Sequence, residues 1–280
     1  MIIFKSANGL SAHLYLLKKE GKKIGFVPTM GALHKGHISL IDQSGKDNNV
    51  TVCSIFINPT QFTNDADFQH YPVTIESDIE ALEGAGCDIL FLPSQSEIYN
   101  ESFVRRHFEL GRLEELLEGH FRPGHFQGVC QVVDRLLQIV PADRLYVGQK
   151  DYQQCMVIAR LLQLTGREKQ VELAIVPTVR EANGLAMSSR NLRLSPADRE
   201  RATAISEVLY ATKSNLSSKS FTKLKEEAFN FLTARGFSVD YIEIADARTL
   251  EAASGVEQPL VALVAASLGD IRLIDNLILN

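Results

Sequence analysis

Residues 24–37 read IGFVPTMGALHKGH, a short apolar run followed by a turn that contains two glycines and two histidines. The apolar run at 24–27 is typical of a buried strand. Gly31 and Gly36 allow the chain to turn tightly and its backbone to approach a ligand. A helix that begins near Gly36 would point free N–H groups and a partial positive charge toward the end of that strand. The stretch therefore predicts a strand, a turn and a helix that together can bind phosphate.

The first two thirds of the chain alternate short apolar runs with longer segments of helical period. Further strand candidates lie at 50–57, 87–92, 144–147 and 171–176. Apolar residues between Val129 and Val140 recur at the i, i+3, i+4 and i+7 spacing of an amphipathic helix. This alternation is typical of a parallel sheet with a helix layer on each face. We therefore predict an α/β fold, with a Rossmann-like parallel sheet and helices on both faces, over residues 1–176.

Beyond the fifth predicted strand the pattern changes. Ser195 and Pro196 form a helix-start signal, with the serine as N-cap and the proline in the first turn. The segment VDYIEIAD at 239–246 alternates apolar and polar residues, as a strand with one buried face does. Two apolar runs then flank a Gly-Asp turn at 269–270, which is a hairpin signature. Residues 177–280 are therefore predicted to form a smaller C-terminal α+β domain.

The composition is that of an ordinary globular protein, with 45% hydrophobic and 22% charged residues. No apolar stretch approaches the roughly 20 residues of a membrane span, and the N-terminus lacks the pattern of a secretory signal. We therefore expect a cytoplasmic protein with no membrane partner. A net charge of −5 disfavours a nucleic-acid partner. The four cysteines stand singly in apolar stretches, which predicts free thiols rather than disulfides or a zinc ribbon.

Polar clusters follow three of the predicted strands: PTMGALHKGH at 28–37, NPTQF at 58–62 and GQKDYQQ at 148–154. In an open parallel sheet, ligands bind beyond the carboxyl ends of the strands, so these clusters should converge there. The imidazoles of His34 and His37 can donate hydrogen bonds to phosphoryl oxygens as negative charge develops. Lys150 would add a positive charge, and MSSRN at 187–191 supplies two hydroxyls and a guanidinium. Together these groups indicate a site for a phosphorylated ligand.

The H-x-G-H pattern at 34–37, with M-S-S-R at 187–190, resembles the nucleotidyltransferase superfamily, whose members attack the α-phosphate of ATP and release pyrophosphate. Five segments narrow the resemblance: FVPTMGALHKGH (26–37), FINPTQF (56–62), EGHFRPGHFQGV (118–129), GQKDYQQ (148–154) and GLAMSSRN (184–191). The tail around IRLIDN at 271–276 matches as well. The chain thus resembles the pantothenate synthetase (pantoate–β-alanine ligase) family over nearly its whole length.

The resemblance implies an enzyme that condenses (R)-pantoate with β-alanine and consumes ATP. The pantoate carboxylate attacks the α-phosphate to form an enzyme-bound pantoyl-adenylate, and the β-alanine amine then displaces AMP. A carboxylate is a poor acyl electrophile because its leaving group would be oxide, whereas AMP is a stable leaving group. Keeping the adenylate from water prevents its hydrolysis. The implied products are pantothenate, AMP and pyrophosphate, in pantothenate and coenzyme A biosynthesis, and the implied assembly is a homodimer.

The same resemblance implies which residues handle ATP. His37, His34 and Lys150 form the catalytic group, with His37 usually assigned as proton donor. The residues that resemble the nucleotide-binding positions are Met30, Gly31, Ala32, Leu33, His34, Lys35, Gly36, His37, Gly148, Gln149, Lys150, Asp151, Val179, Met187, Ser188, Ser189 and Arg190. Val179 resembles the adenine-side contact, and the segment 187–190 resembles a mobile phosphate clamp. Mg²⁺ is expected to accompany the triphosphate, with Asp78 as its candidate protein ligand.

Three amides resemble the residues that hold pantoate: Asn58, Gln61 and Gln154. Amide groups suit this substrate because pantoate presents hydroxyls and a carboxylate to donors and acceptors alike. Gln61 would also border the β-alanine site. A phosphorylated acceptor, as in other adenylyl- or cytidylyltransferases, would instead call for extra arginines near the pocket. The amides therefore favour pantoate over that alternative.

Several positions depart from the family pattern. Val73 stands in YPVT where YPRT is common, and Val147 and Gln149 stand in VGQKD where FGEKD is common. Ser77 occupies a place where a second carboxylate is frequent. The change at 73 removes a positive charge that we place near the mouth of the site. We expect altered affinity rather than lost activity.

Two alternatives from other functional classes stay open at this point. His34, His37, His120 and His125 could supply imidazole ligands to the zinc ion of a hydrolase. That hypothesis leaves the amide clusters and the M-S-S-R segment unexplained. A nucleotide-binding regulator without activity should have lost the clamp or a histidine, and this chain has both. His120 and His125 could also be loop residues that shape access to pantoate or only form local hydrogen bonds, and Arg122 could be a solvated loop charge.

Overall fold

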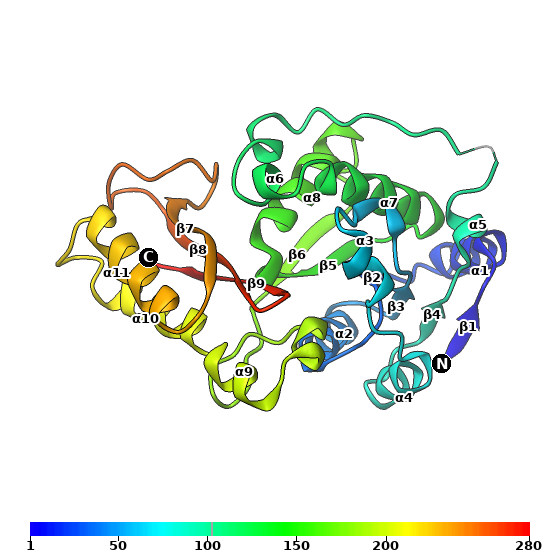
Figure 1. Ribbon diagram of the computed structural model, residues 1–280. Helices are drawn as coiled ribbons and strands as arrows, with labels where there is room; N and C mark the ends of the chain where they lie inside the picture. The colour runs from blue at the N-terminus through cyan, green and yellow to red at the C-terminus, as the bar shows by residue number, and fades with distance from the viewer. Residues whose placement is uncertain (102) are drawn as a thin grey trace.

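The larger of two sheets is fully parallel, with the strand order β1-β4-β3-β2-β5-β6. The computed structural model describes residues 1–101 and 103–280 (Figure 1). The strands are β1 (Ile2–Phe4), β2 (Ile24–Thr29), β3 (Val50–Ile55), β4 (Ile89–Phe91), β5 (Arg144–Gly148) and β6 (Glu172–Val176). All five strands predicted in this part of the sequence are present, and the Rossmann-like fold class is confirmed. The additional strand, β1, has three residues, too few to show a period in the sequence.

Helices cover both faces of this sheet because its strands carry apolar side chains on both. One layer consists of α1 (Ala7–Lys19), α7 (His125–Ile139) and α8 (Tyr152–Leu164), and the other contains α2 (Lys35–Asp47) and α4 (Ile75–Gly84). Within β2, Phe26 packs with the first layer, whereas the next residue, Val27, packs with the second. Both side chains are fully buried, so the sheet forms the middle of a three-layer core.

The smaller sheet is antiparallel and consists of β7 (Ser238–Asp246), β8 (Leu260–Leu268) and β9 (Ile271–Ile278). The predicted hairpin is present: Leu268 pairs with Ile271 across the turn, and Gly269 adopts the left-handed backbone that this turn needs, at φ +57°. Helices α10 (Ala204–Ser214) and α11 (Phe221–Ala234) pack on one face. Figure 1 shows this unit beside the parallel sheet.

Short helices connect these elements. They are α3 (Asp65–Gln69), α5 (Gln95–Ile98), α6 (Glu118–Phe121) and α9 (Pro196–Arg201), with the 3₁₀ helices η1 (Pro59–Gln61), η2 (Gly111–Glu114), η3 (Gln149–Asp151) and η4 (Ser189–Arg193). Helix α9 begins as predicted, because the Ser195 side chain accepts a hydrogen bond from the backbone N–H of Asp198. None of the helices in the described residues is long and apolar enough to cross a membrane.

The second face of the smaller sheet packs against the larger unit. Leu263 of β8 clusters with Leu116 and with Tyr152 of α8. Arg272 of β9 donates two hydrogen bonds to the buried Glu118 carboxylate of α6, at 2.8 and 2.7 Å. A bidentate pair of this kind fixes direction as well as distance. The apolar contacts and the ion pair hold the C-terminal sheet beside the carboxyl end of β5.

A close backbone approach fixes the loop after β3. Gly128 of α7 lies so near η1 that a Cβ atom there would be 2.2 Å from the carbonyl oxygen of Thr60. Its own carbonyl oxygen accepts a hydrogen bond from the Asn58 side chain at 3.1 Å. Glycine at position 128 therefore allows the loop that carries Asn58 and Gln61 to pack against α7.

We predict that Gly128→Ala lowers the free energy of unfolding by about 1–3 kcal/mol, because the added methyl group must displace backbone atoms. Gly45 is the matched control: it also lies in a helix, α2, but a Cβ there meets nothing within 4 Å. Gly45→Ala should raise stability by about 0.5–1 kcal/mol. Urea unfolding of both variants is the measurement, and equal effects in the two would show that the close approach does not matter.

Candidate active site

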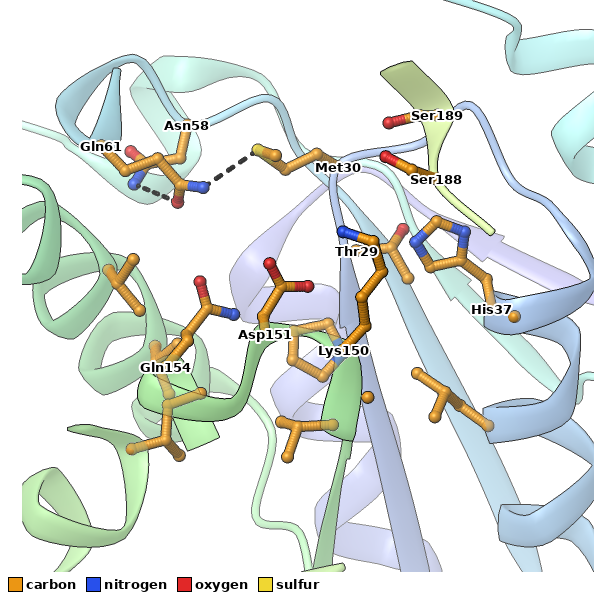
Figure 2. Close-up of a pocket in the computed structure, with 18 of the residues that line it drawn as sticks. Thr29, Met30, His37, Asn58, Gln61, Lys150, Asp151, Gln154, Ser188 and Ser189 are labelled. Atoms are coloured by element: carbon orange, nitrogen blue, oxygen red, sulfur yellow. Dashed lines mark hydrogen bonds between the residues drawn. The ribbon is translucent and has the colours of Figure 1, made fainter. Parts of the chain in front are cut away.

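One cavity lies at the carboxyl ends of β2 and β5 and collects most of the residues predicted from the sequence. The predicted residues that line it are Met30, His34, Gly36, His37, Asn58, Gln61, Gly148, Lys150, Asp151, Gln154, Val179, Met187, Ser188, Ser189 and Arg190. Figure 2 shows the amide side chains on one side of the cavity, His37 and the two serines on the other, and Lys150 with Asp151 between them. The predicted convergence of the three polar clusters is therefore present.

The two imidazoles form the cap of α2. The Nδ1 atom of His34 accepts a hydrogen bond from the backbone N–H of Gly36 at 3.2 Å, and the Nδ1 atom of His37 accepts from the N–H of His34 at 3.3 Å. The two ring centroids are 4.0 Å apart. Because Nδ1 accepts in both rings, each neutral imidazole carries its proton on Nε2. Each ring therefore has an N–H group left to donate to a ligand.

Burial keeps both rings neutral at physiological pH. Burial, followed by the positive charge of Lys150, lowers the pKa of His34 to about 4. Burial also lowers the pKa of His37 well below its usual value, and His34 and Lys150 add to the effect. A pair of neutral imidazoles can donate hydrogen bonds to an anion. Because neither ring is charged, they can also lie close together without electrostatic repulsion. The Nε2–H group is thus the proton-bearing group that His37 offers to a ligand.

The turn before the histidines is held in an uncommon backbone conformation. Gly31 has φ +82° and Ala32 has φ +49°, the left-handed region that a residue with a side chain rarely adopts. The buried carboxylate of Asp78 accepts hydrogen bonds from the backbone N–H groups of Ala32 at 3.0 Å and Leu33 at 2.8 Å. These bonds stabilise the turn that presents His34. Asp78 does not line the cavity, and both of its oxygens bond to protein donors, so the predicted role as a magnesium ligand gives way to a structural one.

Lys150 and Asp151 enter the cavity from η3, directly after β5. Within residues 1–101 and 103–280 the Lys150 ammonium has no hydrogen bond or ion pair, although its main-chain carbonyl is bonded. An uncompensated cation beside two neutral imidazoles favours an anionic ligand. Gln149, between Gly148 and Lys150, points away from the cavity: its side-chain amide donates to Asn276 at 3.4 Å.

The amides form two different arrangements. Asn58 is 1% exposed, and its Nδ2 group donates to the Gln61 side chain and to the Gly128 carbonyl, both at 3.1 Å. Its Oδ1 atom accepts from the Tyr99 hydroxyl at 2.8 Å. Asn58 is thus fully bonded and orients Gln61, whose Nε2 group lies 3.2 Å from the Met30 sulfur. The Gln154 amide has no protein partner in the described part of the chain, so it is free to bond a ligand.

The predicted clamp segment is docked on the α3 region. The Ser189 hydroxyl is 3.1 Å from the Tyr71 hydroxyl, and the Arg190 guanidinium donates to the Asp67 carboxylate at 2.7 Å. Asp67 also accepts from Arg193 at 3.0 Å. Arg190 therefore lines the cavity with its charge already compensated. A phosphate that binds Arg190 must compete with Asp67.

The structure adds cavity residues that the sequence interpretation left open or missed. Arg122 lines the cavity and pairs with Glu118 at 3.5 Å, so it is not a solvated loop charge. His125 also lines the cavity, and its Nδ1–H donates to the Gln61 carbonyl at 2.7 Å. Burial, followed by Arg122, lowers the pKa of His125 to about 4. Arg122 and His125 both belong to the R-P-G-H-F segment at 122–126, and this segment is the sequence signal that could have assigned them to the cavity.

Two further features had no sequence signal. The Thr178 hydroxyl lines the cavity and is buried without a hydrogen-bond partner in the described residues. Apolar side chains form the inner wall of the cavity: Leu40, Phe56, Val129, Val132, Val133, Leu136, Val147 and Ile158. On α7 these side chains follow a helical period, which the sequence could not distinguish from ordinary core packing.

Several predicted residues do not reach the cavity. Gly31, Ala32, Leu33 and Lys35 belong to the turn and helix start but do not line it. Val73 is 67% exposed and lies outside the lining. The Ser77 hydroxyl donates to the Thr74 carbonyl at 3.0 Å, in the first turn of α4. Of the four departures from the family pattern, those at 73, 77 and 149 lie outside the cavity lining, whereas Val147 is part of its apolar wall.

The zinc hydrolase alternative finds no support. The Nδ1 atoms of His34 and His37 are bonded to backbone N–H groups, and His120 is exposed and outside the cavity lining. Among the described residues, no group of three or more His, Cys, Asp or Glu side chains is arranged to hold a metal ion. The imidazoles are organised around the start of α2 rather than around a common centre.

Comparisons with known proteins show the family of the chain. The family model described as Pantoate-beta-alanine ligase matches residues 2–278. A pantothenate synthetase from Bacteroides fragilis (strain YCH46) is 42% identical over 282 residues, covering 99% of this chain and 98% of that protein. One from Cytophaga hutchinsonii is 42% identical over 284 residues, covering 100% and 99%.

Two solved structures share the fold over the whole chain. Pantothenate synthetase from Thermus thermophilus superposes with a TM-score of 0.93 at 39% identity, covering 100% of this chain and 99% of that one. Pantoate-beta-alanine ligase from Francisella tularensis, complexed with beta-gamma ATP and beta-alanine, gives 0.85 at 38% identity, covering 99% and 97%. Because the family model covers residues 2–278 and the relatives are about 42% identical over nearly the whole chain, this protein belongs to the pantoate–β-alanine ligase family.

Proposed function

We propose that this protein condenses pantoate with β-alanine to give pantothenate, AMP and pyrophosphate, through a pantoyl-adenylate held in the cavity. The observation that carries the proposal is the arrangement across one cavity: two neutral imidazole N–H donors and the uncompensated Lys150 ammonium face a free amide and an apolar wall. Cationic and N–H groups suit the phosphates of ATP. The amides and apolar wall suit pantoate, which carries hydroxyls and a carboxylate around a dimethyl-substituted carbon.

In the first step, a carboxylate oxygen of pantoate forms a bond to the α-phosphorus of ATP, and the bond from that phosphorus to the bridging oxygen of pyrophosphate breaks. Negative charge shifts onto the phosphoryl oxygens and the departing pyrophosphate. The Nε2–H groups of His34 and His37 donate hydrogen bonds to these oxygens, and Lys150 offsets their charge. Because the imidazoles are neutral, they stabilise charge without giving up a proton.

In the second step, the neutral amine of β-alanine attacks the acyl carbon, the bond from that carbon to the AMP oxygen breaks, and the nitrogen releases one proton to solvent to give the amide. The ammonium form must first lose a proton, and at pH 7 solution supplies the small neutral fraction. Gln61, oriented by Asn58, and Gln154 hold the pantoyl hydroxyls during both steps. The apolar wall excludes water from the reactive mixed anhydride.

Magnesium fits this site as a companion of ATP. Asp151 is the one acidic side chain among the cavity-lining residues that the structure describes. Mg²⁺ bound to ATP keeps several waters and needs only one or two protein carboxylates besides the phosphates. Asp151 would hold it, and the ion would neutralise charge on the phosphates when bound.

The domain boundary near residue 176 is part of the same proposal, with residues 177–280 acting as a lid over the nucleotide. The nucleotide-side residues Val179 and Met187 lie just past the end of β6, where such a lid would hinge. The homodimer and the cytoplasmic location implied by the family resemblance also stay proposals. Light scattering tests the homodimer: the mass of two chains would support it, and the mass of one chain would contradict it.

The test is to follow AMP and pyrophosphate from ATP and Mg²⁺, with pantoate alone and then with β-alanine added. Sustained AMP formation that requires both acids supports the proposal. Pyrophosphate with pantoate alone should be limited to about one equivalent per site, because the adenylate stays bound. The proposal would be refuted if AMP were released at the same rate without pantoate. It would also be refuted if folded protein gave no product with all substrates present.

We predict that His37→Ala lowers turnover at least about 10²-fold, because it removes a hydrogen-bond donor that acts on developing charge. His107→Ala is the control, since the His107 side chain is 66% exposed and pairs with the exposed Glu109. Initial rates at saturating substrates are the measurement. Near wild-type turnover of a folded His37→Ala variant would remove this residue from the mechanism.

We predict that Gln61→Ala raises the KM for pantoate about 3- to 10-fold, the effect of losing one hydrogen bond. The KM for ATP should change little, because Gln61 lies across the cavity from the histidine side (Figure 2). Gln138→Ala on the exposed part of α7 is the control. An unchanged pantoate saturation curve would count against this placement of the substrate.

A further inference from the structure

The C-terminal strand reaches across to the backbone that carries Lys150. The Asn276 side chain of β9 is 2% exposed, and its Nδ2 group donates to the carbonyl oxygens of Gln149 at 2.9 Å and Lys150 at 2.8 Å. Its Oδ1 atom accepts from the Gln149 side chain at 3.4 Å. One amide therefore bonds two consecutive carbonyls of η3 and one of its side chains.

These bonds matter because η3 is short. It spans three residues between β5 and α8, and the Asn276 side chain adds hydrogen bonds from a distant strand to two of its carbonyls. Both hydrogens of the Asn276 amide are used on them. The turn that projects Lys150 and Asp151 into the cavity is thus fixed by a residue 126 positions away.

Lys150 depends on this support more than most lysines would. In the described residues its ammonium has no protein partner that could orient it, so the position of its backbone sets where the charge lies. That charge is felt at both imidazoles, because Lys150 contributes to lowering the pKa of His34 and of His37. A shift of the turn would move this cation away from the phosphates.

Asn276 is itself held in place. Its backbone N–H donates to the carboxylate of Asp275 at 2.8 Å, and its carbonyl accepts from Arg180 at 3.3 Å. Arg180 also bonds both oxygens of Asp275, at 2.5 and 3.1 Å. Arg180 begins the loop that leads to the cavity residues Met187 and Ser188. The same strand end therefore contacts both segments that enclose the nucleotide side of the cavity.

We propose that Asn276 is a positioning residue for the adenylation step, which fixes the η3 backbone so that the Lys150 ammonium lies against the phosphates. The inference rests on the proposed function. A positioning role differs from a general packing role because the effect of Asn276 on catalysis passes through the Lys150 side chain alone. Losing Asn276 should therefore matter only while Lys150 is present.

The experiment is a double-mutant cycle with Asn276→Ala and Lys150→Ala, read as kcat/KM for ATP and as the dissociation constant of pyrophosphate. Asn276→Ala should lower kcat/KM about 10- to 100-fold, since a displacement near 1 Å can have an effect of that size. In the Lys150→Ala background, Asn276→Ala should lower kcat/KM for ATP by less than about threefold. Pyrophosphate binding should weaken in both single variants and no further in the double variant.

Asn280→Ala is the matched control. Asn280 lies two residues beyond β9, and its amide also donates to two backbone carbonyls, those of Val256 at 3.1 Å and Gln258 at 3.0 Å. Those partners belong to the smaller unit and lie outside the cavity. This variant should keep wild-type kinetics while losing a comparable number of hydrogen bonds.

Asn276→Asp keeps the size of the side chain but removes its donors, so it tests the inference if the alanine variant unfolds. Thermal unfolding of each variant is measured alongside kinetics. Wild-type kinetics in a folded Asn276 variant would overturn the inference, as would an equal loss in the presence and absence of Lys150. An inactive wild-type enzyme would instead refute the proposed function itself.

Discussion

The hydrogen bonding of β2 to β3 on one side and to β5 on the other is the constraint on which the site depends. From β2 the chain proceeds to β3 and β4 in one direction, and it later returns to add β5 and β6 in the other. The segments that leave β2 and β5 therefore diverge to opposite faces, and a crevice opens between them. One segment carries His34 and His37, and the other carries Lys150 and Asp151.

The electrostatics of the cavity follow from this placement. Burial removes the charge from the imidazoles, so they contribute N–H dipoles rather than cations. Arg122 and Arg190 are paired with Glu118 and Asp67, which leaves Lys150 as the cavity cation without a counter-ion in the described residues. A site with only one unpaired cation binds anions mainly through directed hydrogen bonds. It therefore selects ligands by the placement of their oxygens rather than by net charge alone.

Local patterns in the sequence were sufficient for every strand except the three-residue β1, for the hairpin at 269–270 and for the convergence of the polar clusters. Contacts between distant segments were not predictable in this way. The family resemblance suggests Asp78 as the magnesium ligand, whereas the structure shows it bonded to Ala32 and Leu33, a contact that spans about 46 positions and that no local pattern indicates. Asn276 ends the IRLIDN segment of the family resemblance, but the sequence gave it no role, because a single amide in a strand looks the same whether it faces solvent or a catalytic turn.

The most direct measurement follows oxygen atoms from pantoate labelled with oxygen-18 in its carboxylate. If that carboxylate attacks the α-phosphorus in the cavity and AMP later leaves from the acyl carbon, each turnover transfers one labelled oxygen to AMP. Mass spectrometry of the AMP should then show one oxygen-18 per molecule, with none in pyrophosphate. Unlabelled AMP formed together with pantothenate would contradict adenylation, and with it the roles assigned to the two imidazoles and Lys150.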